Sequence, residues 1–319
     1  MSAPVAYTQP MTDAGNVDTF FDGTSRPVGI QIFTLGERVA ADMEGCLHDV
    51  FAIGYREVEL IGYAGHAPGD LKRLFAAAGL RCPSVKYPPR TWLPGQLGLD
   101  RDLDRIVADA HRLELEYVVA MMFRVPDRLW SDPAGDAQIV ALLERASQCM
   151  TADDWKRNAD ALNAAGARLA RAGLALAYHN SNLDFAPVGS TCGYDLLLEA
   201  TDPALVALEM DVGYLVAAGR DPFDYLARHP ARFRLMHIKD IAAAAMPNTV
   251  RFQCNWTEPG AGIVDWHRLL ARARGAGVTH FYYEQEPPFR VSPLHSARAS
   301  HGFLSKLPAL AGPADRREF

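Results

Sequence analysis

Short apolar runs alternate along the chain with segments in which apolar residues recur every three or four positions. The short runs are typical of buried strands, and the longer periodic segments are typical of amphipathic helices. Eight runs are predicted to be strands: Val28–Phe33, Glu57–Ile61, Arg81–Val85, Tyr117–Met121, Leu174–His179, Val206–Asp211, Phe233–His237 and Phe281–Glu284. Because helical segments separate these runs, the strands are expected to be parallel, since parallel neighbours need a crossover connection.

The helical segments carry start and stop signals. Leu71 and Ala78 lie on one helical face, and Gly79 follows them as a C-cap. Thr151 and Asp154 have the spacing of a capping box at the start of the longest predicted helix. Eight such β–α units predict an α/β protein with a closed (β/α)8 TIM barrel as its single domain. A doubly wound open sheet is less favoured, because no GxGxxG motif follows the first strand.

The barrel is expected to occupy residues 27–319, preceded by an N-terminal arm, residues 1–26, that is mobile or packed on a neighbouring subunit. Residues 124–150 and 241–262 exceed the usual loop length, and both follow the carboxyl end of a strand. TIM barrels carry their active sites on that side. The second stretch is therefore expected to form a lid or a pocket wall.

The composition of the chain argues against nucleic-acid-binding, membrane-spanning and disulfide-rich proteins. The chain has 319 residues, 49% of them hydrophobic, and a net charge of −6 without a basic block, so nucleic acid is not expected as a partner. No apolar run approaches the roughly 20 residues that span a bilayer. The five cysteines are scattered without a CxxC pair, which argues against disulfides and a zinc–thiolate site and favours a cytoplasmic protein.

Three successive predicted strands end in residues that bind divalent cations. The sixth, seventh and eighth strands end in Asp211, His237 and Glu284. A barrel brings the carboxyl ends of its strands to one mouth, so these side chains are expected to share one ion through nitrogen and oxygen ligands. The alternatives are a buried core histidine at His237, a helix cap at Asp211, and a buried ion pair at Glu284.

Further polar residues are expected around this ion. His179 ends the fifth strand and is a candidate for both metal ligation and proton transfer, and Lys239 is a candidate catalytic group. Lys86, after the third strand, is a further candidate at the mouth. Candidate substrate-binding residues lie at strand ends or in the long loop, and they are Glu59, Asn180, Glu209, Trp256 and Glu286.

Several motifs are similar to those of one superfamily. They are Val28-Gly-Ile-Gln-Ile-Phe-Thr34, Gly54-Tyr-Arg-Glu-Val-Glu-Leu60, Leu176-Ala-Tyr-His-Asn180, His237-Ile-Lys-Asp240 and Glu258-Pro-Gly-Ala-Gly262. Through them the chain resembles, from about Val28 to Leu307, the sugar phosphate isomerase/epimerase superfamily. These are xylose isomerase-like TIM barrels that also include relatives of endonuclease IV.

The resemblance implies a metal site and an oligomer. Members hold Mn²⁺, Mg²⁺ or Zn²⁺ with Glu, Asp, His and Glu from strands five to eight, which implies Asp211, His237 and Glu284 as ligands here. Ala177 stands where the two-glutamate epimerases have their first Glu, so His179 is the first candidate for the fourth ligand. Many members are dimers or tetramers, so a homo-oligomer is expected.

The resemblance also implies a reaction class. The expected function is a divalent-metal-dependent isomerase or epimerase that acts on a keto sugar through a metal-stabilised enediolate. Glu284, His179 and Lys239 are the candidate catalytic residues. Because one of the two acid/base carboxylates is missing, a lyase that eliminates the anomeric substituent of a 3-keto-glycoside is the alternative. A sugar-binding barrel without catalysis is a second alternative.

Overall fold

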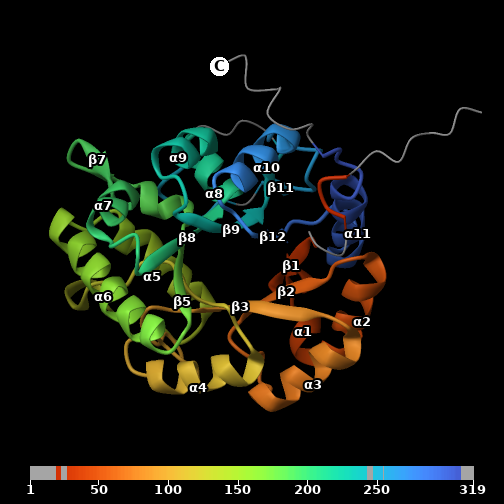
Figure 1. The fold of residues 1–319 in the computed structure, drawn as a ribbon. Coiled ribbons are helices and arrows are strands. Elements are labelled where there is room, and N and C mark those ends of the chain that lie inside the picture. Colours follow the sequence, from red (N-terminus) through yellow and green to blue (C-terminus); the bar gives the residue numbers. More distant parts are fainter. Residues whose placement is uncertain (1–18, 23–26, 243–246, 254, 310–319) are drawn as a thin grey trace, which may run out of the picture.

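Eight parallel strands form one closed barrel, which confirms the predicted single-domain TIM barrel (Figure 1). The structure is a computed structural model that describes residues 19–22, 27–242, 247–253 and 255–309. Around the barrel the strands follow the order β1-β12-β9-β8-β5-β4-β3-β2. Their bounds are β1 (Gly29–Gln31), β2 (Glu57–Ile61), β3 (Arg81–Tyr87), β4 (Tyr117–Met121), β5 (Ala175–His179), β8 (Val206–Asp211), β9 (Phe233–Ile238) and β12 (His280–Tyr283).

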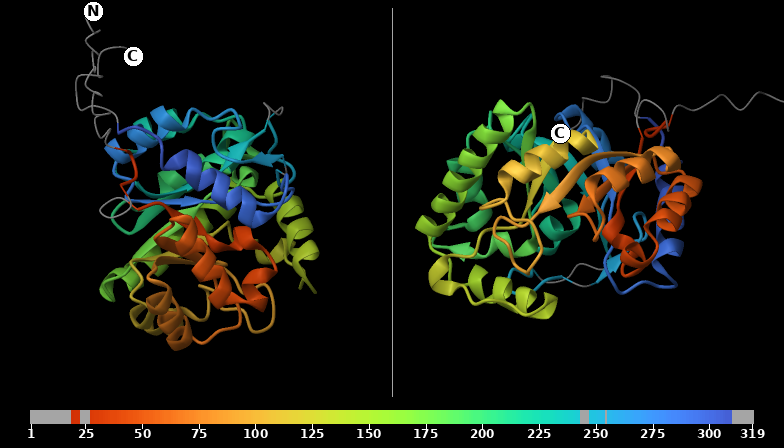
Figure 2. Two further views of the ribbon diagram at one scale, coloured as in Figure 1. Left: turned by 90° about the vertical axis from the view of Figure 1, so that its right-hand side faces the viewer. Right: turned by 90° about the horizontal axis from the view of Figure 1, so that it is seen from below.

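Helices surround the strands in the views of Figures 1 and 2. The longer ones are α2 (Met43–Ile53), α3 (Pro68–Ala78), α4 (Leu103–Leu113), α5 (Asp136–Ser147), α6 (Ala152–Arg171), α7 (Gly193–Ala200), α9 (Pro222–Arg228), α10 (Trp266–Gly275) and α11 (Pro293–Leu304), and the shorter ones are α1 (Arg38–Ala41) and α8 (Val212–Ala217). Helix α6 begins with the predicted capping box of Thr151 and Asp154. Among the described residues, no helix is both long enough and apolar enough to cross a membrane.

Two apolar regions fill the molecule. The larger core lies between strands and helices, and a small cluster inside the barrel consists of Tyr117, Val119, Ala177, Leu235 and Tyr282. Side chains alternate along each strand, so further inward positions lie beyond this cluster, towards the carboxyl ends of the strands. These inward positions are largely polar and build the candidate site.

The first strand is shorter than predicted. β1 ends at Gln31, and the 3₁₀ helix η1 (Ile32–Leu35) begins there. The side-chain oxygen of Gln31 accepts a hydrogen bond from the amide of Phe33 at 3.0 Å, which caps η1. The apolar residues after Gln31 continue the run in the sequence, but the capped turn ends the strand.

The interpretation of residues 124–150 as a long loop is wrong. The segment contains the 3₁₀ helix η2 (Asp127–Leu129) and the three-turn helix α5. Helix α5 buries Ile139, Leu142 and Ala146 along one face. It begins after Gly135 without a side-chain cap, so the sequence gives no start signal there.

The two long stretches contact each other. The amide of Phe252 donates to Glu144 of α5 at 2.9 Å, and Nε2 of Gln148 donates to the carbonyl of Thr249 at 2.7 Å. The segment 247–253 is therefore held against α5. The predicted lid over residues 241–262 stays a prediction, and residues 243–246 and 254 lie outside the described residues.

Most of the predicted N-terminal arm, residues 1–18 and 23–26, also lies outside the described residues. Phe20 and Phe21, between those two stretches, are buried. The amide of Phe20 donates to the carbonyl of Leu307 at 2.7 Å, and both rings meet the ring of Phe281 edge-on at 5.8 Å. This short segment therefore packs on β12.

Candidate metal centre

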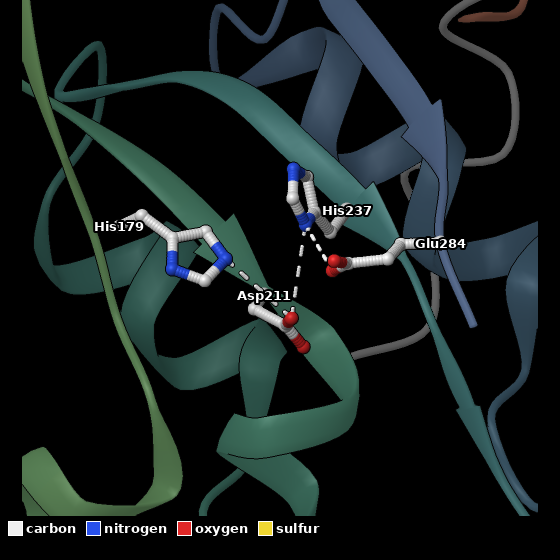
Figure 3. Close-up of side chains that lie close together, drawn as sticks. All are labelled: His179, Asp211, His237 and Glu284. Carbon is white, nitrogen blue, oxygen red and sulfur yellow. Dashed lines mark hydrogen bonds and ion pairs between the residues drawn. The ribbon is translucent and has the colours of Figure 1, made fainter. Parts of the chain in front are cut away.

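Four buried side chains from adjacent strands converge at the mouth of the barrel (Figure 3). His179 ends β5, Asp211 ends β8, His237 lies near the end of β9, and Glu284 follows β12. One potential ligand atom from each lies within 4.8 Å of the others. Nδ1 of His237 is 2.6 Å from Glu284 Oε2 and 3.7 Å from Asp211 Oδ2, and Nε2 of His179 is 3.5 Å from Asp211 Oδ2.

The donor set fits a divalent cation. Both ring nitrogens of His179 and Oδ2 of Asp211 are buried without a hydrogen-bond partner among the described residues. Buried polar atoms without partners cost free energy, and an ion bound between them removes that cost. Two imidazoles and two carboxylates suit a transition metal such as Mn²⁺ or Zn²⁺ better than Ca²⁺, which takes oxygen ligands.

Asp211 caps a helix, as the alternative prediction had it, and it also faces the cluster, while its role as a metal ligand stays a prediction. Its Oδ1 accepts the amide hydrogen of Tyr214 at 2.9 Å and caps α8, while Oδ2 faces the cluster. Asn180 clamps the strand end, since its amide side chain donates to the Asp211 carbonyl at 3.2 Å and accepts from the Asp211 amide at 3.0 Å. These contacts fix the carboxylate before any ion is present.

The far side of the His237 ring is held by carboxylates. Nε2 lies 2.7 Å from Glu59 Oε1 and 3.4 Å from Glu209 Oε1. Glu59 itself accepts hydrogen bonds from Gln31 at 2.9 Å and from Ser84 at 2.8 Å. A carboxylate on one ring nitrogen keeps the proton there and leaves the other nitrogen free for a metal. Glu59 and Glu209 thus support the Nδ1 atom of His237 as a ligand.

The groups of the cluster lie close together in one buried space, so burial and the neighbouring charges shift the pKa of each of them. Burial on its own raises the pKa of Glu59, but the charge and hydrogen bond of His237 outweigh it and lower that pKa to about 2. Burial and the charge of Glu59 raise the pKa of Glu209 to about 7. Burial, aided by the charge of Lys86, lowers the pKa of His179 to about 4. His179 is therefore neutral at pH 7, the form of imidazole that binds metals.

Lys239 lies beside the cluster with its ammonium fully paired. Nζ is 2.5 Å from Glu286 Oε1, 3.4 Å from Glu284 Oε2 and 3.5 Å from Asp211 Oδ2. Burial alone lowers its pKa, but these three carboxylates outweigh burial and raise the pKa well above its ordinary value. The predicted ion pair at Glu284 is thus present together with its place in the cluster.

Two aromatic rings cover Lys239. Its Nζ lies 4.1 Å from the ring centre of Tyr214 and 4.6 Å from that of Trp256. The Tyr214 hydroxyl donates to Glu286 at 2.8 Å. Trp256, in the short strand β11 (Trp256–Thr257), is only 4% exposed. Its contact here is with Lys239 and Tyr214, and the predicted contacts of Trp256 and Glu286 with a substrate stay predictions.

The structure brings together all the residues predicted to be metal-binding or catalytic. Those predicted to bind substrate surround them, with Glu59 and Glu209 behind His237, and Asn180 against the backbone of Asp211. A substrate contact by any of these three stays a prediction. Sequence reasoning missed Gln31 and Ser84, which hold Glu59. Ser84 is in register with Glu59, so a polar residue at an inward position was the available signal.

Asp240 of the His-Ile-Lys-Asp motif has a structural role. Its carboxylate accepts hydrogen bonds from the amides of Gly260 and Val264 at 3.1 and 3.3 Å and from the indole of Trp266 at 2.7 Å. A Cβ atom at Gly262 would lie only 2.1 Å from Asp240 Oδ1. The glycine-rich turn therefore folds onto Asp240, and its second glycine permits that close approach.

Proteins of known structure share this architecture. A sugar phosphate isomerase/epimerase from Parabacteroides distasonis superimposes with a TM-score of 0.70 and 23% identity, over 89% of this chain and 99% of the other. An L-ribulose 3-epimerase superimposes with a TM-score of 0.61 and 14% identity, over 88% and 93% of the two chains. At these identities the similarity shows the fold alone.

Comparison of sequences identifies relatives whose names state an activity. An inosose dehydratase from Geobacillus thermodenitrificans is 30% identical over 150 residues, 43% of this chain and 49% of the relative. The alignment thus spans about half the length of this relative. Residues 47–307 match the family model described as xylose isomerase-like TIM barrel. That match covers most of the barrel, and the chain belongs to the xylose isomerase-like TIM barrel family.

Proposed function

We propose that the protein is a divalent-metal-dependent isomerase or epimerase that acts on a keto sugar or a related polyhydroxylated ketone. The observation that carries this proposal is the buried cluster of His179, Asp211, His237 and Glu284 at the barrel mouth. The family and the sugar-related enzymes among the similar proteins support the substrate class. Homo-oligomer formation stays a prediction from resemblance.

The residues at the cluster and their neighbours have different proposed roles in the reaction. When bound, a divalent cation would supply the positive charge that makes the proton next to a ketone acidic. Glu284 is the carboxylate at the cluster that can accept this proton, and its pKa, well below its ordinary value, keeps it ionised at pH 7. Burial alone raises this pKa, and the charges of Lys239 and His237 outweigh burial. Glu59 keeps His237 oriented, and Asn180 keeps Asp211 in place.

An isomerase or epimerase must return the proton to another carbon or to the opposite face. His179 is the candidate for this second acid/base, because it is neutral at pH 7 and both its ring nitrogens lack hydrogen-bond partners among the described residues. This role requires one nitrogen of His179 to face the substrate. If His179 instead completes the ligand set, the second acid/base is missing.

A lyase is the second candidate, and one observation favours it. Ala177 occupies the inward position of β5 and packs in the apolar cluster, so β5 supplies no carboxylate to the site. A single base such as Glu284 suffices for elimination, and Lys239 can provide a proton to the group that leaves. Inosose dehydratases, which eliminate water as their name states, are among the relatives.

Proton exchange in D₂O tests the proposal. The protein is loaded with Mn²⁺ and incubated with D-fructose, inosose and a 3-keto-glucoside, and the products are followed by NMR. Deuterium uptake without loss of a group supports an isomerase or epimerase, while release of water or the anomeric group supports a lyase. If the metal-loaded protein neither exchanges a proton nor converts any ketone in a wider keto-sugar panel, the proposal is wrong.

A further inference from the structure

The metal donors come from only one half of the barrel wall. Strands β5, β8, β9 and β12 are consecutive in the ring, and they carry all four members of the cluster. The other half consists of β4, β3, β2 and β1. β3 is separated from β9 by three strands in either direction, so the side chains of β3 face the cluster from the opposite wall.

Lys86 projects from β3 into this space. It lies two residues after Ser84, whose hydroxyl contacts Glu59 and Tyr282 inside the barrel at 2.8 and 3.0 Å. Residues two apart on a strand share a face, so Lys86 is also inward, one layer closer to the mouth. It is paired in register with Val119, a member of the interior cluster, and is 3% exposed.

Unlike Lys239, Lys86 is a largely buried lysine, 3% exposed, whose ammonium has no hydrogen-bond acceptor and no ion-pair partner among the residues that the structure describes. Its charge nevertheless acts on the site, because it helps to lower the pKa of Glu284 and of His179. An ammonium with three donors and no protein acceptor needs water or a bound molecule to accept its hydrogen bonds.

We propose that Lys86 is a catalytic, substrate-binding residue. Its ammonium donates a hydrogen bond to an oxygen of the bound keto sugar on the side away from the metal ligands. There it stabilises the negative charge that develops on that oxygen as Glu284 removes the neighbouring proton. This inference rests on the proposed function and adds a second positive group, fixed on the opposite wall, to the charge of the cation.

The test compares two lysine-to-methionine substitutions of similar shape. Lys86→Met removes the unpaired ammonium, and Lys72→Met removes an exposed lysine that pairs with Glu114 on the outer helices. The probe is glycolohydroxamate, a small planar anion that imitates an enediolate, titrated into the Mn²⁺-loaded protein. Mn²⁺ affinity and melting temperature are measured for each variant, and kcat and KM are measured on any ketone that the wild type converts.

For Lys86→Met we expect hydroxamate affinity to fall at least tenfold and kcat to fall more than KM changes. Mn²⁺ affinity should be equal or tighter, because a cation has left the surroundings of the ion. Lys72→Met should match the wild type, and Lys86→Arg should recover part of the loss. If Lys86→Met folds poorly, Lys86→Arg and Lys86→Gln are compared instead, and equal hydroxamate affinities in these two variants contradict the inference.

Two negative results have different meanings. If the wild type binds hydroxamate in a metal-dependent way and Lys86→Met binds it equally well, the role of Lys86 is wrong and the proposed function stands. If the metal-loaded wild type binds no hydroxamate and exchanges no proton, the proposed function is wrong, and the role of Lys86 is wrong with it.

Discussion

Two buried histidines lie between pairs of carboxylates at opposite ends of the barrel. At the mouth, the ring nitrogens of His237 lie 2.6 Å from Glu284 and 2.7 Å from Glu59. At the amino ends of the strands, those of His280 lie 2.9 Å from Glu57 and 3.3 Å from Glu116. Each histidine thus has a carboxylate at both ring nitrogens, but the polar groups around the two histidines differ in how completely they are paired. This difference indicates a structural role for His280 and a functional role for His237.

The cluster around His280 is saturated. Arg81 lies 3.3 Å from Glu57 and 2.5 Å from Glu116, so both carboxylates have partners besides the histidine. At the mouth, Asp211 Oδ2, both nitrogens of His179 and both oxygens of Glu209 are buried without hydrogen bonds among the described residues. A saturated cluster stabilises the fold, whereas an unsaturated one suits a cation or a substrate.

The largest effect is expected from His237→Ala. Loss of Nδ1 removes a proposed metal ligand, so kcat/KM is expected to fall by about 10³-fold, with Mn²⁺ lost from the purified protein. Steady-state kinetics and metal analysis measure the two changes, and circular dichroism confirms the fold. The matched variant His280→Ala is expected to keep its metal and its kcat. Full activity in His237→Ala would contradict the proposed site.

The second largest effect is expected at the amino ends of the strands, on the free energy of unfolding. His280→Ala leaves Glu57 buried beside fewer partners, and breaking such a buried pair costs about 3 kcal/mol of unfolding free energy. Urea denaturation of metal-free protein measures this loss. A change below about 0.5 kcal/mol, the range of ordinary surface substitutions, would show that the His280 cluster does not stabilise the fold.

Removal of the metal is expected to give the third effect. An ion that binds only the folded state stabilises it by about 2.7 kcal/mol when its free concentration is 100 times Kd. Treatment with EDTA should therefore lower the melting temperature, and added Mn²⁺ should restore it. The His237→Ala variant is the control, since its melting temperature should respond to neither reagent.

A smaller effect is expected for Glu59→Gln, which tests the carboxylate behind His237. The substitution keeps the shape but weakens the acceptor that holds the Nε2 proton. Mn²⁺ affinity is expected to fall by about 10–100-fold, as for other carboxylates that orient a metal-binding histidine. Competition with a fluorescent chelator measures the affinity. Glu57→Gln, which alters the equivalent carboxylate at His280, should leave it unchanged.

The smallest effect concerns pH. Burial alone lowers the pKa of His280, but the hydrogen bond to Glu57 and the charges of Glu57 and Glu116 outweigh it, so the pKa is raised. The stability from this histidine is then fully present below about pH 6.5 and is lost as pH rises through the raised pKa. In metal-free protein, the stability difference between wild type and His280→Gln should shrink as the pH rises from 6 to 9, and urea denaturation at each pH measures it. A pH-independent difference would contradict this assignment.

The sequence predicted the barrel and the cluster because both follow from local patterns. Apolar runs that end in Asp211, His237 and Glu284 identify strands and their carboxyl ends together. Contacts between strands that are distant in the sequence could not be predicted from such local patterns. The support of His237 by Glu59 joins residues 178 positions apart, and its geometry depends on the register of β2 and β3. His280 was not singled out, because its partners, Glu57 on β2 and Glu116 just before β4, are distant in the sequence.

Asp211 connects the proposed ion site, the end of β8 and the start of α8 through one side chain. With Oδ1 on the amide of Tyr214 and Oδ2 towards the cluster, any pull on the carboxylate by a cation is transmitted to the first turn of α8. Hydrogen–deuterium exchange at the Tyr214 amide can therefore report on occupancy of the site without any substrate. A longer glutamate at position 211 would uncouple the helix from the ion, whereas asparagine would keep the helix start and remove the negative charge.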